Sequence, residues 1–400
     1  MPGGDAEVLI VGASPAGLLL AGDLAADGVR VLVLDHERAG PGPGHRAIVH
    51  ARALEQLDAR GAADPLVAAG WPTGQVQAGP IRVRLAGLPS RFPFALLIEP
   101  DLAGSLLAAR AEALGARIAA VAGVGDLRAG HDGVGLRAAI RGGPAASVSA
   151  GYLVCDDGDV AVRASLGSDH PGRVLAVPAR ARAAGLDPAG LDPALQDAAN
   201  LGWKLASLLR GRAEPRLLAS YQQERSFAAG HAARVTRRLL LAERIRPEPL
   251  RRAAHAVAAA TSAGPLGEVT ARAVSGISLA YPGGPHRLAG HRAPDLVLAG
   301  QPPHRLYQAL RRQRPVLLAG ASALAGLGAL LALWPGRVTV AEPASAAAAL
   351  MLIRPDGYVA WASDTDAQAR RYADLRQALA CWCGPPAAPP LASLTAIDTR

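Results

Sequence analysis

A glycine-containing turn near residue 12 has residue types and a spacing that can bind phosphate. It lies between two apolar runs, the second of which ends in an acid. In chain order the parts are Val8–Val11, Gly12–Gly17, Val31–Leu34 and Asp35. This order predicts a β-α-β unit, in which the free N–H groups at the start of the helix bind a pyrophosphate. Gly12 would allow the tight turn, and Gly17 would let the helix pack close to the strand.

The same unit supplies the first candidate cofactor-binding residues. Asp35, with His36 after it, would accept hydrogen bonds from ribose hydroxyls. Ala16 lies within the turn, and Ser14 occupies the position of the middle glycine, at which the backbone must approach a phosphate. Because a serine fits there only if its hydroxyl points away, the unit predicts either dinucleotide binding or a Rossmann scaffold with an empty site.

Composition argues against a nucleic-acid partner. The 400 residues suffice for two or three domains with a sizeable core. A formal net charge of +9 suggests nucleic-acid binding at first. The basic residues, however, are scattered arginines, with Lys204 as the only lysine. No basic helix or aromatic-interleaved patch is present, so no nucleic-acid partner is predicted.

Cysteine usage and hydropathy predict a cytoplasmic protein. Cys155, Cys381 and Cys383 form neither a disulfide framework nor a redox CxxC pair, which favours a reducing compartment. No metal site is predicted. The chain opens on a strand rather than on a signal peptide. The uncharged stretch 316–334 is bracketed by prolines and divides into a strand and a helix, so no membrane span is predicted.

Apolar periodicity and turn residues predict two successive α/β regions. In the first region we expect helices over 102–114, 195–209 and 215–241, and strands within 118–140, 152–155 and 173–177. Beyond Tyr281 we expect strands over 295–298, 316–319, 337–340 and 351–354, and helices over 304–312 and 365–382. The second region therefore reads as a small separate α/β domain.

Short motifs along the whole chain carry a resemblance to one family. They are Gly12–Gly17, His45–Ala47 with His50–Arg52, Gly87–Phe94, Gln196–Leu205, Tyr221–Arg225, His291–Asp295 and Arg354–Trp361. Together they resemble the FAD-dependent aromatic hydroxylases of aromatic-polyketide biosynthesis, which are flavin monooxygenases similar to p-hydroxybenzoate hydroxylase. The last two motifs resemble the thioredoxin-like C-terminal domain of that family.

The resemblance implies an α/β fold with a Rossmann-type FAD/NAD(P)-binding domain, a truncated middle β-sheet domain and a C-terminal thioredoxin-like domain. Residues 1–280 would form the first part, with a reduced substrate sheet at about 75–150 and a helical region at 195–280. Residues 281–400 would form the thioredoxin-like domain, which supports a homodimer in such proteins. The resemblance adds Arg46, Arg52 and Asp157 to the candidate cofactor-binding residues.

The implied activity needs no catalytic side chain. NADPH would reduce FAD, and the reduced flavin would activate O2 to hydroxylate a phenolic ring of a small-molecule aromatic polyketide. The cofactor supplies this chemistry, and the protein supplies binding, orientation and exclusion of water. Four histidines, His36, His45, His50 and His170, are isolated in the sequence, and we interpret them as solvated or structural.

Residues expected around the redox ring depart from the family pattern. The departures are Pro178–Ala179 for a Gly-Asp pair, Asp159 for an arginine, Pro100 for a glutamine, and Asp187, Pro188, Asp192 and Pro193 in or beside a glycine-rich loop. Carboxylates in that loop would repel an anionic flavin. Charge-assisted hydrogen bonds contribute about 1.5–3 kcal/mol each, so two or three losses predict FAD binding weakened roughly a hundred- to ten-thousand-fold.

The substrate side is also reduced, and three functions remain open. Few residues separate Gly158 from Gly172, where the family places most of its substrate sheet. The first hypothesis is a flavin hydroxylase with a minimal pocket. The second is a flavin-free homologue that cyclises or opens a ring of a polyketide. The third is a non-enzymatic binding or assembly partner of an oxygenase.

Overall fold

The computed structural model describes residues 6–36, 46–78, 81–130, 133–156, 173–177, 191–239, 247–261, 264–300, 302–324, 326–345, 350–365 and 367–387. The candidate residue Asp157 and the departures at Pro178–Ala179, Asp159, Asp187 and Pro188 lie outside these residues. The chain divides into two compact units. The first unit comprises Met1–Ala206 and Tyr221–Leu279, and the second comprises Ser207–Ser220 and Ala280–Arg400.

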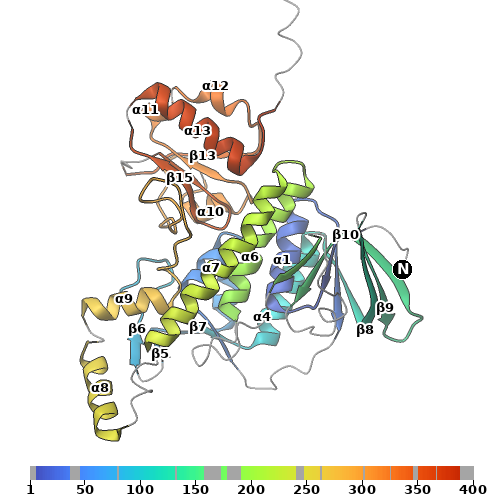
Figure 1. Ribbon diagram of the computed structural model, residues 1–400, viewed down its shortest axis with the longest axis horizontal. Helices are drawn as coiled ribbons and strands as arrows, with labels where there is room; N and C mark the ends of the chain where they lie inside the picture. Colours follow the sequence, from blue (N-terminus) through green and yellow to red (C-terminus); the bar gives the residue numbers. More distant parts are fainter. Residues whose placement is uncertain are drawn as a thin grey trace, which may run out of the picture. The chain divides into compact units, whose positions relative to one another are not determined.

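The first unit contains most of the secondary structure (Figure 1). Its strands are β1 (Ala6–Val11), β2 (Val31–His36), β3 (Ala47–Val49), β4 (Trp71–Thr73), β5 (Gln75–Ala78), β6 (Ile81–Arg84), β7 (Ala95–Ile98), β8 (Arg117–Gly130), β9 (Gly133–Ile140), β10 (Ala146–Asp156) and β11 (Val174–Val177). Its helices are α1 (Pro15–Ala26), α2 (Ala51–Asp58), α3 (Ala63–Ala69), α4 (Pro100–Ala113), α8 (Glu248–Thr261) and α9 (Pro265–Val274), together with most of α6 (Leu191–Leu209) and α7 (Pro215–Leu239).

A parallel sheet forms the centre of the first unit. The strands lie in the order β8-β2-β1-β10-β11, and each neighbouring pair in this order is parallel. This is the order of a doubly wound nucleotide-binding fold. Val8, Leu9, Ile10 and Val11 of β1 are completely buried, as expected for a parallel strand that is covered on both faces. The predicted Rossmann-type α/β fold is therefore confirmed.

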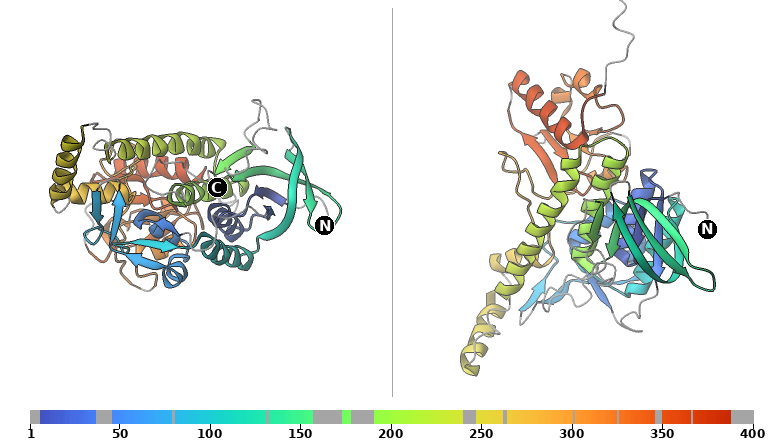
Figure 2. Two further views of the ribbon diagram at one scale, coloured as in Figure 1. Left: turned by 90° about the horizontal axis from the view of Figure 1, so that it is seen from below. Right: turned by 45° about the vertical axis from the view of Figure 1, so that its right-hand side comes forward.

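An antiparallel meander covers one face of this sheet. Strands β8, β9 and β10 pair antiparallel in that order, so the predicted region 118–140 consists of two long strands. Leu136 and Ala138 of the meander share a buried cluster with Leu9 and Leu34 of the parallel sheet. Figure 2 shows α1 and α4 on the opposite side of the sheet from the meander.

Two small sheets complete the first unit. Strands β3, β7 and β4 form one sheet, and β5 and β6 form a two-stranded sheet. Val76 and Val83 of the two-stranded sheet pack in one cluster with Leu239 of α7 and Ala271 of α9. The outer residues of the same strands, such as Arg82 and Arg84, are exposed. Among its described residues, the part of the chain expected to form a substrate sheet therefore contains only short strands besides the meander.

The second unit has a separate sheet. Its elements are β12 (Val316–Leu318), β13 (Thr339–Ala341), β14 (Leu350–Ile353), β15 (Val359–Ser363), α10 (Leu306–Leu310), α11 (Ala321–Leu324), α12 (Gly328–Leu331) and α13 (Gln368–Cys383). The strand order is β13-β12-β14-β15, with β13 parallel to β12 and the other pairs antiparallel. Leu375 and Leu379 of α13 pack against Leu317 and Leu352 of the sheet. This arrangement matches the predicted thioredoxin-like domain.

Two expectations for the second unit can be checked directly. The stretch 316–334 contains β12, α11 and α12, and among the described residues no helix is long and apolar enough to cross a membrane.

Burial raises the pKa of the Cys383 thiol to about 12, so this thiol stays protonated at neutral pH. A protonated, buried thiol beside the exposed Cys381 agrees with the absence of a redox CxxC pair from the sequence.

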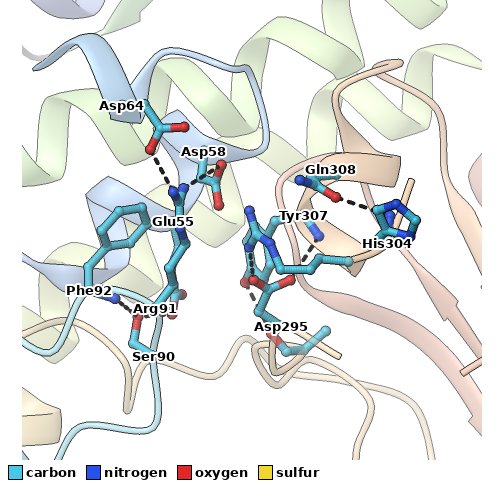
Figure 3. A network of polar contacts seen from close by, with 12 residues as sticks. Glu55, Asp58, Asp64, Ser90, Arg91, Phe92, Asp295, His304, Tyr307 and Gln308 are labelled. Atoms are coloured by element: carbon cyan, nitrogen blue, oxygen red, sulfur yellow. Dashed lines mark hydrogen bonds and ion pairs between the residues drawn. The ribbon is translucent and has the colours of Figure 1, made fainter. Parts of the chain in front are cut away.

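The predicted strand over 295–298 is wrong. Val297 and Leu298 make only isolated bridges to Arg305 and Pro343. The side chain of Asp295 instead binds the start of α10, where it accepts the backbone N–H of Tyr307 at 3.1 Å and pairs with Arg305 (Figure 3). The motif His291–Asp295 therefore anchors a helix rather than extending a sheet.

The hydroxyl of Tyr307 provides a test of this anchor. It donates a hydrogen bond of 3.0 Å to the carbonyl of Ala293, and the residue is 1% exposed. Tyr307→Phe removes the donor and leaves a buried carbonyl with one partner fewer. We expect a loss of about 1 kcal/mol in the free energy of unfolding of the second unit, measured by hydrogen exchange of α10 amides. Loss of less than a few tenths of a kcal/mol would contradict the anchoring role.

Candidate functional site

The turn after β1 joins the carboxyl ends of the two central strands. Gly12 has a φ of 106°, a left-handed conformation that favours glycine. Its N–H donates a hydrogen bond of 3.0 Å to the carbonyl of Leu34 at the end of β2. Gly12 and Asp35 thus lie at the same edge of the sheet, outside the carboxyl ends of parallel strands, where doubly wound folds bind their ligands.

Ser14 is the N-cap of α1. Its hydroxyl oxygen accepts the N–H of Gly17 at 3.2 Å, and Pro15 occupies the first helical position. The hydroxyl is therefore turned onto the first turn of the helix, which is how a serine fits at the position of the middle glycine. Ala16 and Gly17 are buried in that turn. The start of α1 with its positive dipole end is thus placed at the edge that carries Gly12.

Three further candidate residues are Asp35 and His36 at the end of β2 and Arg46 just before β3. Asp35 and His36 end β2, half-buried, and pair with Ala120 and Val121 of β8. Arg46 is exposed, and its guanidinium carbon lies 4.1 Å from the centre of the Trp71 ring. This arrangement is a cation–π contact.

Arg52 belongs to a buried network of polar side chains. It is completely buried in α2 and pairs with Glu55 at 3.0 Å. Glu55 in turn accepts the hydroxyl of Ser90 at 2.6 Å, and Arg91 pairs with Asp58 and Asp64 nearby (Figure 3). Through Glu55, these contacts connect Arg52 of the motif His50–Arg52 to Ser90 of the motif Gly87–Phe94, so the two motifs share a structural role.

One arginine joins three helices behind the edge. Arg60, after the end of α2, donates hydrogen bonds to the carboxylate of Asp23 at 2.6 Å and to the carbonyl of Ala199 at 3.0 Å. Asp23 is the ninth residue of α1, and Ala199 is the ninth residue of α6. A Cβ atom on Gly202 would come within 2.9 Å of Asp23, so only glycine lets α6 approach α1 this closely.

Of these three helices, α1 begins at the carboxyl edge of the sheet. Helix α1 follows β1, and α6 follows β11, and both strands end at the same edge because they run parallel to β10. Helices α2 and α6 run in the same direction. His50, at the start of α2, contacts the start of α6, and Arg60, after the end of α2, contacts the middle of α6. The edge therefore receives the N-terminus of α1, an arrangement that favours anionic ligands.

His50 and Asp192 form a pair between the starts of α2 and α6. The N–H of His50 donates a hydrogen bond of 2.8 Å to the carboxylate of Asp192, and the Nδ1 atom of the ring pairs with the other carboxylate oxygen. The side chains are 6% and 13% exposed. His50, which stands alone in the sequence, therefore has a structural partner in the fold. Its partner lies 142 residues away, and no local pattern in the sequence could have identified it.

The motifs Gln196–Leu205 and Tyr221–Arg225 hold α6 against α7. Lys204, completely buried, pairs with Glu224 at 2.9 Å, and Asn200 donates to the same carboxylate oxygen at 2.6 Å. Arg225 pairs with Asp197 at 3.2 Å. These side chains position α6, and with it Asp192 at the start of that helix.

Comparison with protein families identifies the class of protein. The model of the FAD binding domain matches residues 5–182 and 182–236, and the model of the aromatic-ring hydroxylase C-terminal domain matches residues 286–386. The chain belongs to this family of FAD-binding aromatic-ring hydroxylases, as its motifs predicted. FAD is therefore the cofactor for which the fold is built.

Individual relatives extend over nearly the whole chain. The 12-dehydrotetracycline 5-monooxygenase/anhydrotetracycline 6-monooxygenase of Streptomyces rimosus subsp. rimosus is 29% identical over 95% of this chain and 99% of its own. The solved structure of BexE, studied for oxidation during BE-7585A biosynthesis, is 27% identical with a TM-score of 0.80 over 96% of this chain and 100% of its own. The dialkyldecalin synthase of Streptomyces rugosporus is 36% identical over 49% of this chain and 38% of its own.

The chain is shorter than such relatives. Its alignment with the Streptomyces rimosus enzyme runs over 507 positions, more than its own 400 residues, so that enzyme contains segments that this chain lacks. One place where residues are few is the connection from Asp156 of β10 to Val174 of β11. A connection between parallel neighbours needs a dozen or more residues for the crossover itself. Little chain remains there for the additional strands that the resemblance implies.

The residues of the edge fit the two halves of FAD differently. The ADP half matches the turn at Gly12, the start of α1 and the carboxylate of Asp35, which together offer N–H donors and a ribose acceptor. At the start of α6, by contrast, Asp192 presents a carboxylate that His50 holds in place. The edge therefore offers groups that fit the nucleotide half of FAD, while the start of α6 carries a carboxylate that is paired with His50.

Proposed function

We propose that this protein is an FAD-dependent monooxygenase that hydroxylates a phenolic ring of a small-molecule aromatic polyketide, with NADPH as the reductant. The observation that carries the proposal is the turn at Gly12, which places the start of α1 and Asp35 at one edge of a doubly wound sheet. The matched family models and the anhydrotetracycline monooxygenase relative support the redox chemistry and the class of substrate.

The protein residues bind and orient the cofactor. The start of α1, from Gly12 to Gly17, would hold the pyrophosphate, Asp35 would bind the ribose of the adenosine, and Arg46 would contact a phosphate. When bound, FAD supplies the transfer of electrons from NADPH to O2. The protein excludes water and holds the phenolic ring beside the cofactor. His36, Ala16, Arg52 and Asp157 remain further predictions from the sequence; Arg52 contributes through the buried network that positions α2.

A second candidate function is a non-redox ring-forming reaction on a polyketide. Two observations favour it. The start of α6 carries the His50–Asp192 pair rather than uncharged groups, and a dialkyldecalin synthase is 36% identical over about half of this chain. A further proposal is that the protein is cytoplasmic and that its thioredoxin-like domain supports a homodimer.

Reconstitution with FAD tests the first function against the second. Purified protein is titrated with FAD while flavin fluorescence is followed, and NADPH oxidation is then measured with and without a phenolic polycycle such as anhydrotetracycline as the probe. We expect saturable FAD binding and NADPH oxidation that the probe accelerates. Protein that does not bind FAD at millimolar concentration would exclude the monooxygenase and leave the non-redox candidate. The variant Asp35→Ala should weaken FAD binding about tenfold, because a ribose loses its charged acceptor.

The sequence departure beside β11 offers a second arm of the same test. The double variant Pro178→Gly with Ala179→Asp restores the residues that the family carries after this strand. We expect it to increase the affinity for FAD, measured by the same titration. No increase would indicate that the shortened sheet or the altered loop determines the affinity instead.

A further inference from the structure

The last turns of α7 carry a row of cationic side chains above an aromatic ring. Phe227, His231, Arg234 and Arg238 recur at helical spacing, which places them on one face of the helix. The guanidinium carbon of Arg234 lies 5.9 Å from the centre of the Phe227 ring. Arg234 and Arg238 are exposed. These four residues are called the α7 row, and they extend over about 16 Å of helix.

The positive charge of the α7 row is not offset by ion pairs among the described residues. No carboxylate of these residues pairs with Arg234 or Arg238. Elsewhere on the same helix, Arg216 and Arg225 each pair with a carboxylate, at 3.0 and 3.2 Å. Burial lowers the pKa of His231, and the nearby charges of Arg234 and Arg238 lower it further. The cations of the row therefore repel one another, and an anionic partner would relieve this repulsion.

The helix dipole accounts for only part of this charge. The end of a helix favours cations within its last turn, which is where Arg237 and Arg238 lie. Arg234 lies before that turn, and the influence of the dipole has fallen off there. Stabilisation of the helix end therefore does not explain why the row continues along α7.

Helix α9 adds exposed apolar side chains to the same region. Val235 and Leu239 of α7 pack in one cluster with Ala271 of α9, so the end of α7 lies against α9 (Figure 1). Leu266 and Val269 of α9 are 58% and 62% exposed. Large apolar side chains that are exposed together mark a surface that binds another molecule.

Ser278 connects the α7 row to the end of α9. Its hydroxyl oxygen lies 3.5 Å from the Nε2 atom of His231, and its N–H donates a hydrogen bond of 3.0 Å to the carbonyl of Arg272. Arg272 is exposed and follows Leu266 and Val269 along α9 at intervals of one turn. These three residues are called the α9 stripe. The α7 row and the α9 stripe therefore meet at Ser278.

The composition of this surface suits a protein rather than a nucleic acid. Arginine and apolar side chains together are typical of the centre of protein interfaces. A nucleic acid would pair with the cations and leave Leu266 and Val269 exposed to water. The net charge of +9 attracts an acidic partner at long range and keeps second copies of this chain apart. The occupant that fits is an amphipathic helix with carboxylates on one side and apolar side chains beside them.

We infer that the α7 row and the α9 stripe form a docking surface for an acidic, amphipathic helix of another protein. Arg234 and Arg238 pair with the carboxylates of that helix, and Leu266 and Val269 are buried beneath its apolar side chains. The surface contains none of the candidate cofactor-binding residues, so this inference does not depend on FAD.

A designed peptide serves as the probe. It is a fluorescein-labelled, alanine-rich helix of about 20 residues, with glutamates along one face and leucines beside them. Binding is followed by fluorescence anisotropy. A second peptide has the same composition, but its glutamates are distributed around the helix. We expect saturable binding of the first peptide, about tenfold tighter than that of the second, and weaker binding as salt is raised to about 1 M, where charges are screened beyond about 3 Å.

Variants of the chain locate the surface. The double variant Arg234→Gln with Arg238→Gln should weaken binding of the first peptide about fivefold, as expected for the loss of two exposed ion pairs. Leu266→Ser should weaken it about fivefold as well, but should not affect a peptide whose leucines are replaced by alanine. The matched control is Arg216→Gln, which removes a 61% exposed arginine near the other end of α7 and should leave the affinity unchanged.

Three results would overturn the inference. An equal loss of affinity in Arg216→Gln would show that net charge alone governs binding. Equal binding of the two peptides would show that the surface does not recognise an acidic helix face. A labelled DNA duplex that binds more tightly than the first peptide would indicate a nucleic-acid surface instead. Failure of the chain to bind FAD would overturn the proposed function and leave this docking surface standing, because the peptide assay does not use the cofactor.

Discussion

Replacing Arg60 with methionine should lower the free energy of unfolding of the first unit by about 3–5 kcal/mol. The guanidinium is completely buried and binds Asp23, which is itself 1% exposed, and also the carbonyls of Gln56 and Ala199. Methionine fills much of the same volume but removes this partner from the carboxylate of Asp23, whose contact with Arg110 is longer, at 3.7 Å. Removing one partner of a buried ion pair lowers the free energy of unfolding by more than the pair contributed to it, because the desolvation of the remaining charge is no longer offset.

Hydrogen exchange of the α1 and α6 amides measures this effect within the first unit, because it reports the free energy of opening of those helices. The matched control is Arg30→Met, which removes an arginine paired with Glu7 at 3.5 Å but 64% exposed. Exposed pairs contribute at most about 1 kcal/mol, and often less. Equal protection in both variants would show that Arg60 does not hold the three helices together. A selective loss would also be expected to weaken FAD binding, since α1 begins at the carboxyl edge.

Local patterns in the sequence predicted the elements that bind the nucleotide half. The apolar runs Val8–Val11 and Val31–Leu34 are continuous because parallel central strands are covered on both faces, and such runs are recognisable without any tertiary information. Gly12 was identified because its conformation is available to few other residues. Helices α4 and α7 were predicted to within two residues at each end, from apolar periodicity and flanking breakers.

Residues that act through distant partners were beyond such patterns. Asp192 was expected in or beside a glycine-rich loop, but it lies in the first turn of α6 and is paired with His50. Arg52 stays a predicted cofactor-binding residue, and its pairing with Glu55 was not foreseen. Segment 295–298 has the composition of a strand, yet the carboxylate of Asp295 binds the start of α10 instead. For Asp192 the partner lies 142 residues away, and for Arg52 and Asp295 a side-chain pairing sets the contacts; hydrophobic periodicity carries no information about such pairings.

Gly12→Ala should reduce the affinity for FAD about a hundredfold while the fold is retained. Alanine at a φ of 106° is strained by about 1–3 kcal/mol, and its methyl group would stand where the backbone approaches the pyrophosphate. The hydrogen bond from this N–H to Leu34, which aligns the ends of β1 and β2, would be distorted as the turn relaxes. A hundredfold loss corresponds to about 2.7 kcal/mol, measured by titration with FAD.

Gly28→Ala is the matched control for this prediction. Gly28 follows the other end of α1, with a φ of 78° and no atom within 4 Å of the added methyl group. It should therefore bear a comparable backbone strain at a position remote from the carboxyl edge. Both variants should lose stability to a similar extent, but only Gly12→Ala should lose affinity for FAD. An equal loss of affinity in both would mean that strain in α1, rather than the approach of the pyrophosphate to the turn, governs binding; unchanged affinity in Gly12→Ala would remove the turn after β1 from the cofactor site.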